Sequence, residues 1–269
     1  MIIFKSINKL NKEVNFKANI GFVPTMGALH KGHISLINSC KKKCKKTLVS
    51  IFINPSQFNK KSDFHSYPRN LKKDIKILKK LKVDYLFIPN VKEIYRNKKS
   101  MQIKLKKKDK ILCAFYRPGH FEGVLAVIDQ FLKKMKIKYI FLGEKDYQQI
   151  YLIRKFIKNK HNVEIISCKT LRTNKLLPFS SRNSLLSKNN IKKASLVSLH
   201  LYKFYHSLKK NITNKSRLKI IKQKIESQNV KIEYFDLRNK NNFSKNFNKY
   251  NFKIFISYYI NKVRLIDNF

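Results

Sequence analysis

Two histidines flanking a glycine carry the clearest chemistry in this sequence. His30 and His33 flank Gly32 within residues 24–33 (PTMGALHKGH), directly after the apolar run 20–23. On the first turn of a helix, residues three apart share one face, so both imidazoles can converge on one anion. A strand, a turn of small residues and a helix N-terminus are a common phosphate site, because the first N–H groups are unpaired. The segment therefore predicts a nucleotide-binding turn, although histidines near a loop can also be surface or capping residues.

Further polar side chains follow two other apolar runs. Lys145 and Gln149 lie in residues 143–149 (GEKDYQQ), and Asn54 and Gln57 lie together after another run. A lysine at such a junction can neutralise phosphate, and an amide can hold a small hydroxy acid through its donor and its acceptor. Taken singly, these residues can equally be solvated surface or caps of loops.

A third polar group combines two hydroxyls with a guanidinium. Ser180, Ser181 and Arg182 are consecutive. The planar fork of arginine matches pairs of phosphate oxygens, and the hydroxyls add two donors. The triplet therefore suits the β- and γ-phosphates of a nucleotide, while by itself it can also be a polar turn.

Apolar runs alternate with helical periodicity over about the first two thirds of the chain. We predict strands over residues 20–24, 47–54, 84–89, 139–142 and 163–168, and helices over residues 32–45, 70–81, 120–135 and 146–160. This alternation is typical of a doubly wound, Rossmann-like parallel sheet, whose strands are covered on both faces. Ligands of such sheets bind at the carboxyl ends of the strands. We therefore expect residues 24–33, 54–57 and 143–149 to form one site.

The alternation stops after residue 171, where we place a domain boundary. The prediction is a Rossmann-like α/β domain over residues 1–171 and a smaller α+β domain over residues 172–269. In the second part, Ser187 is a typical N-cap for a long helix. The remaining predicted elements are helices to about residue 209 and over 214–228, and strands over 231–237, 252–259 and 263–266.

The charge of the chain suggests a different kind of partner. The 269 residues include 61 Lys and Arg against 15 Asp and Glu, which gives a formal net charge of +46. Such an excess suits binding to nucleic acid or an acidic membrane surface. Lysines occur in every segment, however, and no basic motif interleaved with aromatic residues accompanies them. We interpret most of them as solvated surface, with nonspecific binding to polyanions as a side effect.

The apolar stretches and the cysteines of the sequence predict its cellular location and metal content. Residues 1–6 lack the apolar core of a signal peptide, and no stretch is apolar for the roughly 18 residues of a membrane helix, so we predict a cytoplasmic protein. The four cysteines, Cys40, Cys44, Cys113 and Cys168, form no Cys-x-x-Cys pair. We predict free thiols in the core and no metal site built from side chains.

Together these motifs resemble the pantothenate synthetase family, also called pantoate–β-alanine ligases, of the His-x-Gly-His nucleotidyltransferase superfamily. The matching segments are residues 23–30, 32–33, 50–52, 54–55, 57–58, 67–69, 117–121, 143–149, 180–183 and 264–268. The resemblance covers the whole chain. It implies ATP-dependent condensation of (R)-pantoate with β-alanine through a pantoyl adenylate, with AMP and pyrophosphate as the other products. It also implies Mg²⁺ bound with the ATP phosphates, a homodimer, and a C-terminal domain that acts as a lid.

The resemblance assigns nucleotide contacts and catalysis to particular residues. The ATP-binding positions it implies are Met26, Gly27, Ala28, Leu29, His30, Lys31, Gly32, His33, Gly143, Glu144, Lys145, Asp146, Leu171, Phe179, Ser180, Ser181 and Arg182. His33 matches the residue that the family assigns as proton donor, and His30 and Lys145 complete the catalytic set. Because a carboxylate carries no proton to remove, we expect His33 to act chiefly as a hydrogen-bond donor to phosphate oxygens.

The same resemblance assigns residues to the two other substrates, the acid pantoate and the amine β-alanine. Gln57 and Gln149 match amides that bind pantoate, and Asn54 matches a position beside β-alanine. Arg117 and His120 match a motif that lines the same cleft.

The sequence departs from the family pattern at two places. Residues 175–179 read Lys-Leu-Leu-Pro-Phe where the family usually has Asp-Gly-Leu-Ala-Met, and Lys31 replaces a common acidic residue. Proline fixes its own φ and restricts the residue before it. We therefore expect an altered hinge between the domains.

Two other functions stay open at this stage. One is a related adenylyltransferase that transfers AMP to a phosphorylated acceptor, which should offer extra arginines in place of Gln57 and Gln149. The other is a basic nucleic-acid-binding protein that has lost catalysis, which the intact histidines, lysine and serines disfavour.

Overall fold

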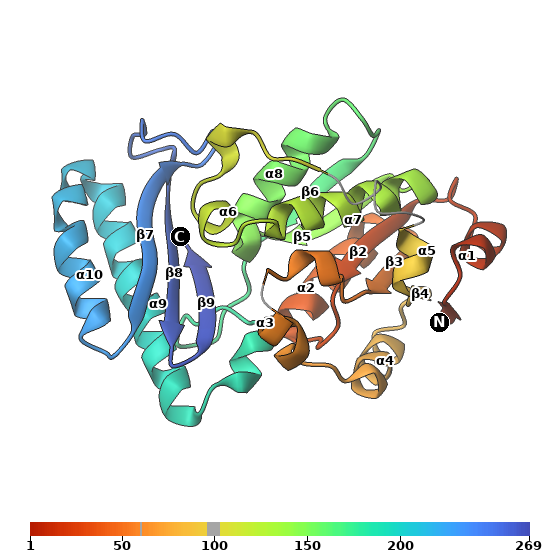
Figure 1. The fold of residues 1–269 in the computed structure, drawn as a ribbon, viewed down its shortest axis with the longest axis horizontal. Helices are drawn as coiled ribbons and strands as arrows, with labels where there is room; N and C mark the ends of the chain where they lie inside the picture. Colours follow the sequence, from red (N-terminus) through yellow and green to blue (C-terminus); the bar gives the residue numbers. More distant parts are fainter. Residues whose placement is uncertain (60, 96–102) are drawn as a thin grey trace. The chain divides into compact units, whose positions relative to one another are not determined.

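The chain folds into two compact units. The computed structural model describes residues 1–59, 61–95 and 103–269. These divide into Met1–Lys169 and Thr170–Phe269, and Figure 1 shows a separate sheet in each. Each unit is described by itself. The nucleotide-binding and lid roles that the sequence predicts for the two parts stay predictions.

The first unit is built on a parallel sheet in the order β1-β4-β3-β2-β5-β6. Its strands are β1 (Ile2–Phe4), β2 (Ile20–Thr25), β3 (Lys46–Ile51), β4 (Tyr85–Phe87), β5 (Tyr139–Gly143) and β6 (Glu164–Cys168). All five neighbouring pairs are parallel. The order turns back between β2 and β5, which is the switch point where doubly wound sheets bind ligands. The predicted fold class is confirmed.

Helices connect these strands. They are α1 (Ile7–Glu13), α2 (Lys31–Lys43), α3 (Lys61–Ser66), α4 (Leu71–Lys80), α5 (Val91–Ile94), α6 (Cys113–Tyr116), α7 (His120–Lys134) and α8 (Tyr147–Ile157), with short 3₁₀ turns η1 (Pro55–Gln57), η3 (Lys107–Asp109) and η4 (Glu144–Asp146). The four long predicted helices correspond to α2, α4, α7 and α8. At the start of α4, Asn70 Oδ1 accepts from the N–H of Lys73 at 3.0 Å, which satisfies one of the unpaired donors of the first turn.

The central strands of this unit are covered on both faces. Phe22 and Val23 on β2 are consecutive and fully buried, as are Leu48 and Val49 on β3. Consecutive residues of a strand point to opposite faces. Burial of both therefore explains why these strands are continuously apolar.

The cysteines are buried free thiols, as predicted. A Cβ atom at Gly21 would lie 2.3 Å from Cys40 Sγ and 2.8 Å from Cys44 Sγ, so glycine is needed where α2 packs on β2. Burial raises the pKa of the Cys40 thiol to about 12, and it also raises the pKa values of Cys44 and Cys168. These thiols are therefore protonated core groups at neutral pH.

The second unit is a small α+β fold with its own core, as predicted. Its antiparallel sheet is β7 (Lys231–Asn239), β8 (Phe252–Ile260) and β9 (Val263–Asn268), in that order, and its helices are α9 (Lys188–Lys210) and α10 (Leu218–Glu226), with 3₁₀ turns η5 (Ser181–Leu185) and η6 (Ile212–Arg217). Ser187 is the N-cap of α9, and its Oγ accepts from the N–H of Asn190 at 3.2 Å. Leu201 and Leu208 of α9 pack in one buried cluster with Ile254 of β8.

Residues 175–179 do not form a hinge between the units, which corrects the expectation from the sequence. They lie inside the second unit, in a tight turn. The N–H of Thr173 donates to Leu177 O at 2.9 Å, and Arg172 and Pro178 form an antiparallel bridge. Leu176 takes a left-handed φ of +65° to close the turn. Pro178 is compatible with this turn, because the hydrogen bonds on either side of the bridge use the N–H groups of Thr173 and Phe179, and position 178 needs no N–H donor.

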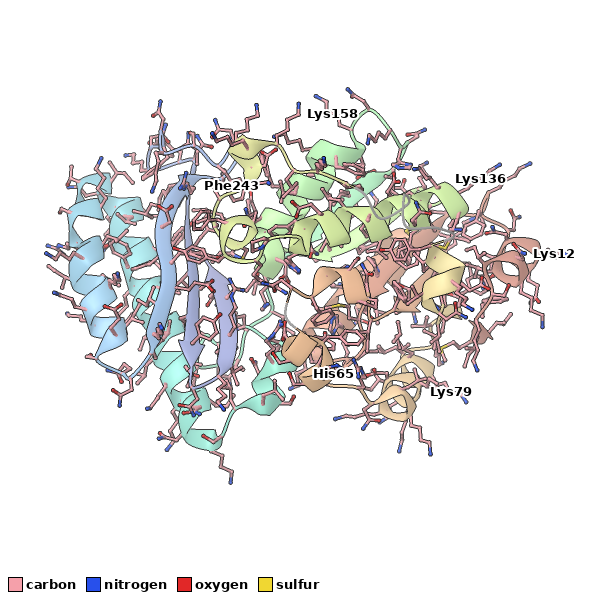
Figure 2. All side chains as sticks on the ribbon, viewed as in Figure 1. Lys12, His65, Lys79, Lys136, Lys158 and Phe243 are labelled. Atoms are coloured by element: carbon pink, nitrogen blue, oxygen red, sulfur yellow. The ribbon has the colours of Figure 1, made fainter. Side chains whose placement is uncertain are left out.

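The basic side chains are spread over many elements. Figure 2 labels Lys12, Lys79, Lys136 and Lys158 on four different segments of the first unit, all pointing away from the ribbon. All four side chains are exposed. In the part of the chain that the structure describes, no helix is both long and apolar enough to cross a membrane.

Candidate active site

The chain reverses sharply where β2 ends. Thr25 Oγ donates to Ser50 O at 2.7 Å and accepts from the N–H of Gly27 at 3.1 Å. Gly27 and Ala28 both take positive φ values, +77° and +50°. Glycine tolerates this region at no steric cost, whereas alanine is held there by its surroundings. The turn thereby delivers His30 to the position directly before α2.

His30 and His33 form a reciprocal cap at the start of α2. His30 Nδ1 accepts from the N–H of Gly32 at 3.1 Å, and His33 Nδ1 accepts from the N–H of His30 at 3.4 Å. The two ring centroids lie 4.1 Å apart. Since each Nδ1 accepts a hydrogen bond, each neutral ring carries its proton on Nε2. The geometry therefore confirms the capping interpretation and leaves the Nε2–H groups as donors, while binding of an anion by them stays a prediction.

Both imidazoles are neutral at pH 7. Burial lowers the pKa of His30 to about 4, and the nearby cation of Lys145 contributes to this shift. Burial also lowers the pKa of His33 to about 3, with smaller contributions from His30 and Lys145. A ring with such a pKa donates a hydrogen bond but holds no extra proton. This favours the hydrogen-bonding role for His33 over that of an imidazolium acid.

Lys145 lies in η4, directly after β5. Its side chain is 19% exposed, and its Nζ lies 3.8 Å from the carboxylate of Asp146. Strands β2 and β5 are neighbours in the sheet, and their carboxyl ends meet at the switch point. The structure thus brings Lys145 beside the two imidazoles, as the sequence predicts.

Four backbone N–H groups of the histidine turn already donate to side chains of the protein. This corrects the expectation that these amides bind phosphate. Asp74 Oδ2 accepts from the N–H of Ala28 at 2.9 Å, and its Oδ1 accepts from Leu29 at 2.8 Å. The N–H groups of Gly27 and Gly32 donate to side chains of the turn itself. Each of these four N–H groups therefore already has an acceptor within the protein. The side chains of the two histidines and Lys145 are therefore the groups of this region that we consider for contact with a nucleotide.

Asn54 caps the loop after β3. Its Oδ1 accepts from the N–H of Ser56 at 3.3 Å and from Ser56 Oγ at 2.9 Å, and its Nδ2 donates to Gly123 O at 3.0 Å. The side chain is fully buried. Its geometry favours the capping interpretation over direct contact with a substrate.

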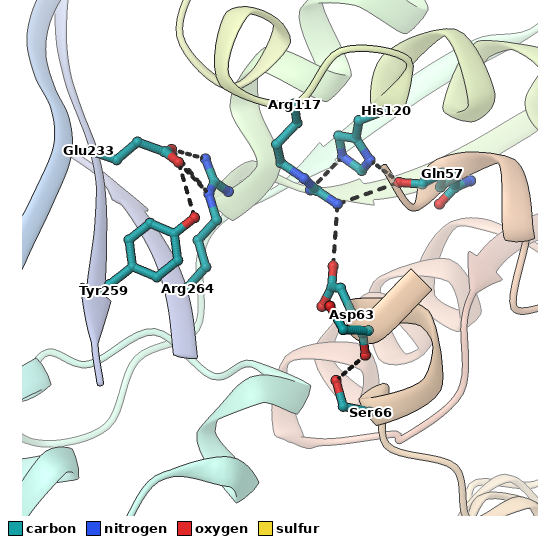
Figure 3. A network of polar contacts seen from close by, with 9 residues as sticks. Gln57, Asp63, Ser66, Arg117, His120, Glu233, Tyr259 and Arg264 are labelled. Carbon is teal, nitrogen blue, oxygen red and sulfur yellow. Dashed lines mark hydrogen bonds and ion pairs between the residues drawn. The ribbon is translucent and has the colours of Figure 1, made fainter. Parts of the chain in front are cut away.

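Gln57 is held at the end of this loop by the start of α7. Gln57 O accepts from His120 Nδ1 at 2.7 Å, and His120 Nε2 accepts from Arg117 Nη1 at 2.9 Å. Figure 3 shows this chain of contacts, with Arg117 also facing Asp63 at 3.8 Å. A Cβ at Gly123 would lie 2.3 Å from Ser56 O. The loop therefore packs tightly on α7, which fixes the backbone that carries Gln57.

The two predicted amides flank the histidine turn. Gln57 follows β3 and Gln149 lies in the first turn of α8, which follows β5. The sheet order places β2 between β3 and β5, so all three loops leave the same edge. Gln149 is partly exposed, whereas Gln148 points elsewhere and donates to Ile111 O at 2.7 Å.

The predicted nucleotide contacts from residue 171 onward lie together in the second unit. Leu171, Phe179, Ser180, Ser181 and Arg182 belong to one short loop that ends in η5. The N–H of Phe179 donates to Leu171 O at 3.1 Å, and Ser180 Oγ accepts from the N–H of Arg182 at 3.3 Å. Leu171 is 40% exposed, which leaves an apolar surface on this loop.

A buried ion pair holds this loop to the last strand. Arg172 Nη1 and Nη2 donate to the two carboxylate oxygens of Asp267 at 2.9 and 2.8 Å. Arg172 also donates to Leu176 O and Asn268 O, at 2.8 and 2.9 Å. The turn at residues 173–178 is thus fixed to β9.

Comparisons with known proteins identify the family. A family model described as pantoate-beta-alanine ligase matches residues 2–269. The pantothenate synthetase of Francisella tularensis subsp. mediasiatica is 42% identical over 267 residues, covering 98% of this chain and 94% of the relative. That of Francisella tularensis subsp. novicida is 42% identical over 274 residues, covering 100% of this chain and 97% of the relative.

Solved structures give the same result. A pantoate-β-alanine ligase from Francisella tularensis, complexed with "Beta-gamma ATP" and β-alanine, is 39% identical with a TM-score of 0.85, covering 100% of this chain and 97% of its own. Pantothenate synthetase from Thermus thermophilus is 26% identical with a TM-score of 0.88, covering 100% of this chain and 99% of its own. The match spans the histidine turn, the amide loops and the Ser180–Arg182 segment alike, and this chain therefore belongs to the pantoate–β-alanine ligase family.

Proposed function

We propose that this chain condenses (R)-pantoate with β-alanine at the expense of ATP, giving pantothenate, AMP and pyrophosphate. The observation that carries the proposal is the pair of Nε2–H donors on His30 and His33 beside Lys145, at the switch point of the sheet. The related Francisella tularensis structure, which contains an ATP compound and β-alanine, supports ATP and β-alanine as substrates here.

In the first step, a carboxylate oxygen of pantoate attacks the α-phosphorus of ATP, and the bond to the bridging oxygen breaks to release pyrophosphate. The attacking carboxylate is already ionised, so no base is needed. The protein must align the reactants and stabilise charge on the phosphoryl oxygens. His30, His33 and Lys145 supply two neutral donors and one cation for that task.

In the second step, the free amine of β-alanine attacks the acyl carbon of pantoyl adenylate. The C–N bond forms, the amine loses a proton and AMP leaves. We assign Gln57 and Gln149 to hold pantoate, and we assign Asn54 to fix the loop that carries Gln57. The second unit acts in this proposal as the lid, bringing Ser180, Ser181 and Arg182 to the ATP phosphates and excluding water.

Mg²⁺ enters this proposal with the ATP phosphates. Mg²⁺ in nucleotide sites is held by phosphate oxygens, water and one or two carboxylates. Asp146 is the carboxylate beside Lys145 and is partly exposed, so it is suited to such a minor share of the ligands. Within the described residues, no group of three or more His, Cys, Asp or Glu side chains lies together as a metal site.

We extend the proposal to a homodimer in the cytoplasm, on the strength of the family likeness. Sedimentation of the purified chain tests the dimer, and a concentration-independent monomer would contradict it.

The function is tested by AMP formation from ATP, with pantoate and β-alanine omitted in turn. We expect AMP only when both are present, and pyrophosphate exchange with pantoate alone. A polynucleotide titration serves as the comparison, because the basic surface allows a second outcome. Tight polynucleotide binding without any AMP formation would contradict the proposal.

A further inference from the structure

A buried carboxylate from a distant helix fills the amide cradle of the histidine turn. Asp74 lies in α4, 45 residues from Leu29 in the sequence. Its two oxygens each accept one backbone N–H, from Ala28 at 2.9 Å and from Leu29 at 2.8 Å. Two consecutive amides that follow a left-handed turn form a typical anion-binding concavity. Here the anion is a side chain of the protein.

The turn is shaped around this carboxylate. Asp74 is 2% exposed. A Cβ on Gly27 would lie 3.0 Å from Asp74 Oδ2, and Ala28, which has a left-handed φ, donates its N–H to the same oxygen. Among residues 1–59, 61–95 and 103–269, the structure records no ion pair for Asp74. Its charge is therefore balanced chiefly by the two amides.

The turn that Asp74 holds leads directly into the capping pair. Leu29 is the residue before His30, and the N–H of His30 in turn donates to His33 Nδ1. A shift at Ala28 and Leu29 therefore displaces both rings. We propose that Asp74 is a positioning residue, which occupies the amide cradle in place of phosphate and holds the two imidazoles where they donate hydrogen bonds to the phosphate oxygens of ATP. The proposal rests on the adenylation function proposed above.

Asparagine at position 74 isolates this role. It keeps the shape of aspartate but offers one acceptor oxygen, so its amide N–H₂ would face a backbone N–H. Burial raises the pKa of Asp74, so the folded protein favours the neutral form of this side chain more than water does. The variant Asp74→Asn should therefore fold and still lose the arrangement of the turn.

The matched control is Asp84→Asn. Asp84 also accepts from a backbone amide, that of Thr47 at 2.9 Å, but it lies before β4, at the amino ends of the strands. For Asp74→Asn we expect kcat/KM for ATP to fall by about 10²-fold, the cost of misplaced catalytic groups. We expect KM for β-alanine to stay within twofold, and Asp84→Asn to leave both values within twofold. A kcat/KM for ATP in Asp74→Asn close to wild type would overturn the proposal.

Hydrogen exchange in the wild-type protein tests the cradle without any variant. If Asp74 occupies it, the amides of Ala28 and Leu29 are protected before nucleotide is added, and ATP changes their exchange less than about twofold. Rapid exchange that ATP suppresses would show that phosphate takes these amides, which would overturn the proposal.

This second measurement separates the two proposals. A wild-type protein that forms no AMP would contradict the proposed function. The exchange of Ala28 and Leu29 in the free protein would still decide whether Asp74 fills the cradle.

Discussion

Each of the two loops that we assign to ATP is held by one buried aspartate, but the two carboxylates have different kinds of partner. Asp74 holds the histidine turn of the first unit through two backbone amides. Asp267 holds the loop at residues 171–182 of the second unit through the guanidinium of Arg172 and the hydroxyl of Ser198. Two backbone amides fix the turn that carries the histidine pair, whereas a full ion pair fixes the loop to a strand.

Because their partners differ, we expect substitution of the two aspartates to have different consequences. A neutral asparagine in place of Asp74 leaves no buried cation behind. A neutral asparagine in place of Asp267 leaves the guanidinium of Arg172 without its partner in a mostly buried site. Loss of one partner of a buried pair is costly, because the other charge stays desolvated. We therefore expect the first change to affect mainly the reaction and the second mainly the fold.

The largest expected effect comes from Asp267→Asn. We expect the free energy of unfolding of the protein to fall by about 3–5 kcal/mol, because Arg172 is left uncompensated. Urea unfolding measures this. The double variant Arg172→Met/Asp267→Asn should recover part of the loss. A loss below about 1 kcal/mol, typical of exposed pairs, would remove the contrast with Asp74.

The next effect concerns Lys145, the cation in η4. Lys145→Met should lower the rate of pyrophosphate exchange by about 10²–10³-fold, since it removes charge stabilisation from the transferring phosphoryl group. Lys158→Met is the control, because that lysine is exposed on the first unit (Figure 2). Unchanged exchange in Lys145→Met would mean that the imidazoles act alone.

The smallest effect is a dependence of stability on pH. The pKa values of His30 and His33 are lowered in the folded protein, to about 4 and about 3. The unfolded chain therefore takes up protons first as the pH falls below about 6.5, so stability is full above that pH and declines below it. These pKa values correspond to about 2 kcal/mol per ring between pH 7 and pH 5, and because both rings are partly exposed we expect about half of that, about 1 kcal/mol each.

Urea unfolding at both pH values measures this loss. The variant His30→Gln/His33→Gln should lose about 2 kcal/mol less than wild type over the same interval. An equal loss in both proteins would show that the two rings are not held neutral.

Much of the fold follows from local pattern. The central strands are continuously apolar, and the long helices have a clear period, so their existence is readable from the sequence. The short elements β1, α1 and α5 are not readable in this way, because three to seven residues carry too little periodicity. The hinge expected at residues 175–179 comes from the family pattern. The tight turn found there cannot be read locally, because the bonds from Arg172 to Asp267 that fix it join residues 95 apart.

The candidate site also contains residues that local sequence predicts and one that it does not. The spacing of His30 and His33 is a local signal, and so is the position of Lys145 after a strand. The role of Asp74 is not readable locally, because an acidic residue near a helix start is commonplace and its partners lie on another loop. Its local signal is only the first turn of a predicted helix, where burial is unexpected for an acidic residue.

The central claim is that two neutral imidazoles of the histidine turn stabilise the transferring phosphoryl group. Pantoate-dependent exchange of pyrophosphate into ATP, measured from pH 5 to pH 9 in wild type and in His33→Ala, tests it most directly. We expect wild-type exchange without an inflection near pH 6.5, and a loss of about 10²-fold in the variant at every pH. Near-normal exchange in His33→Ala, or no exchange in wild type, would contradict the account.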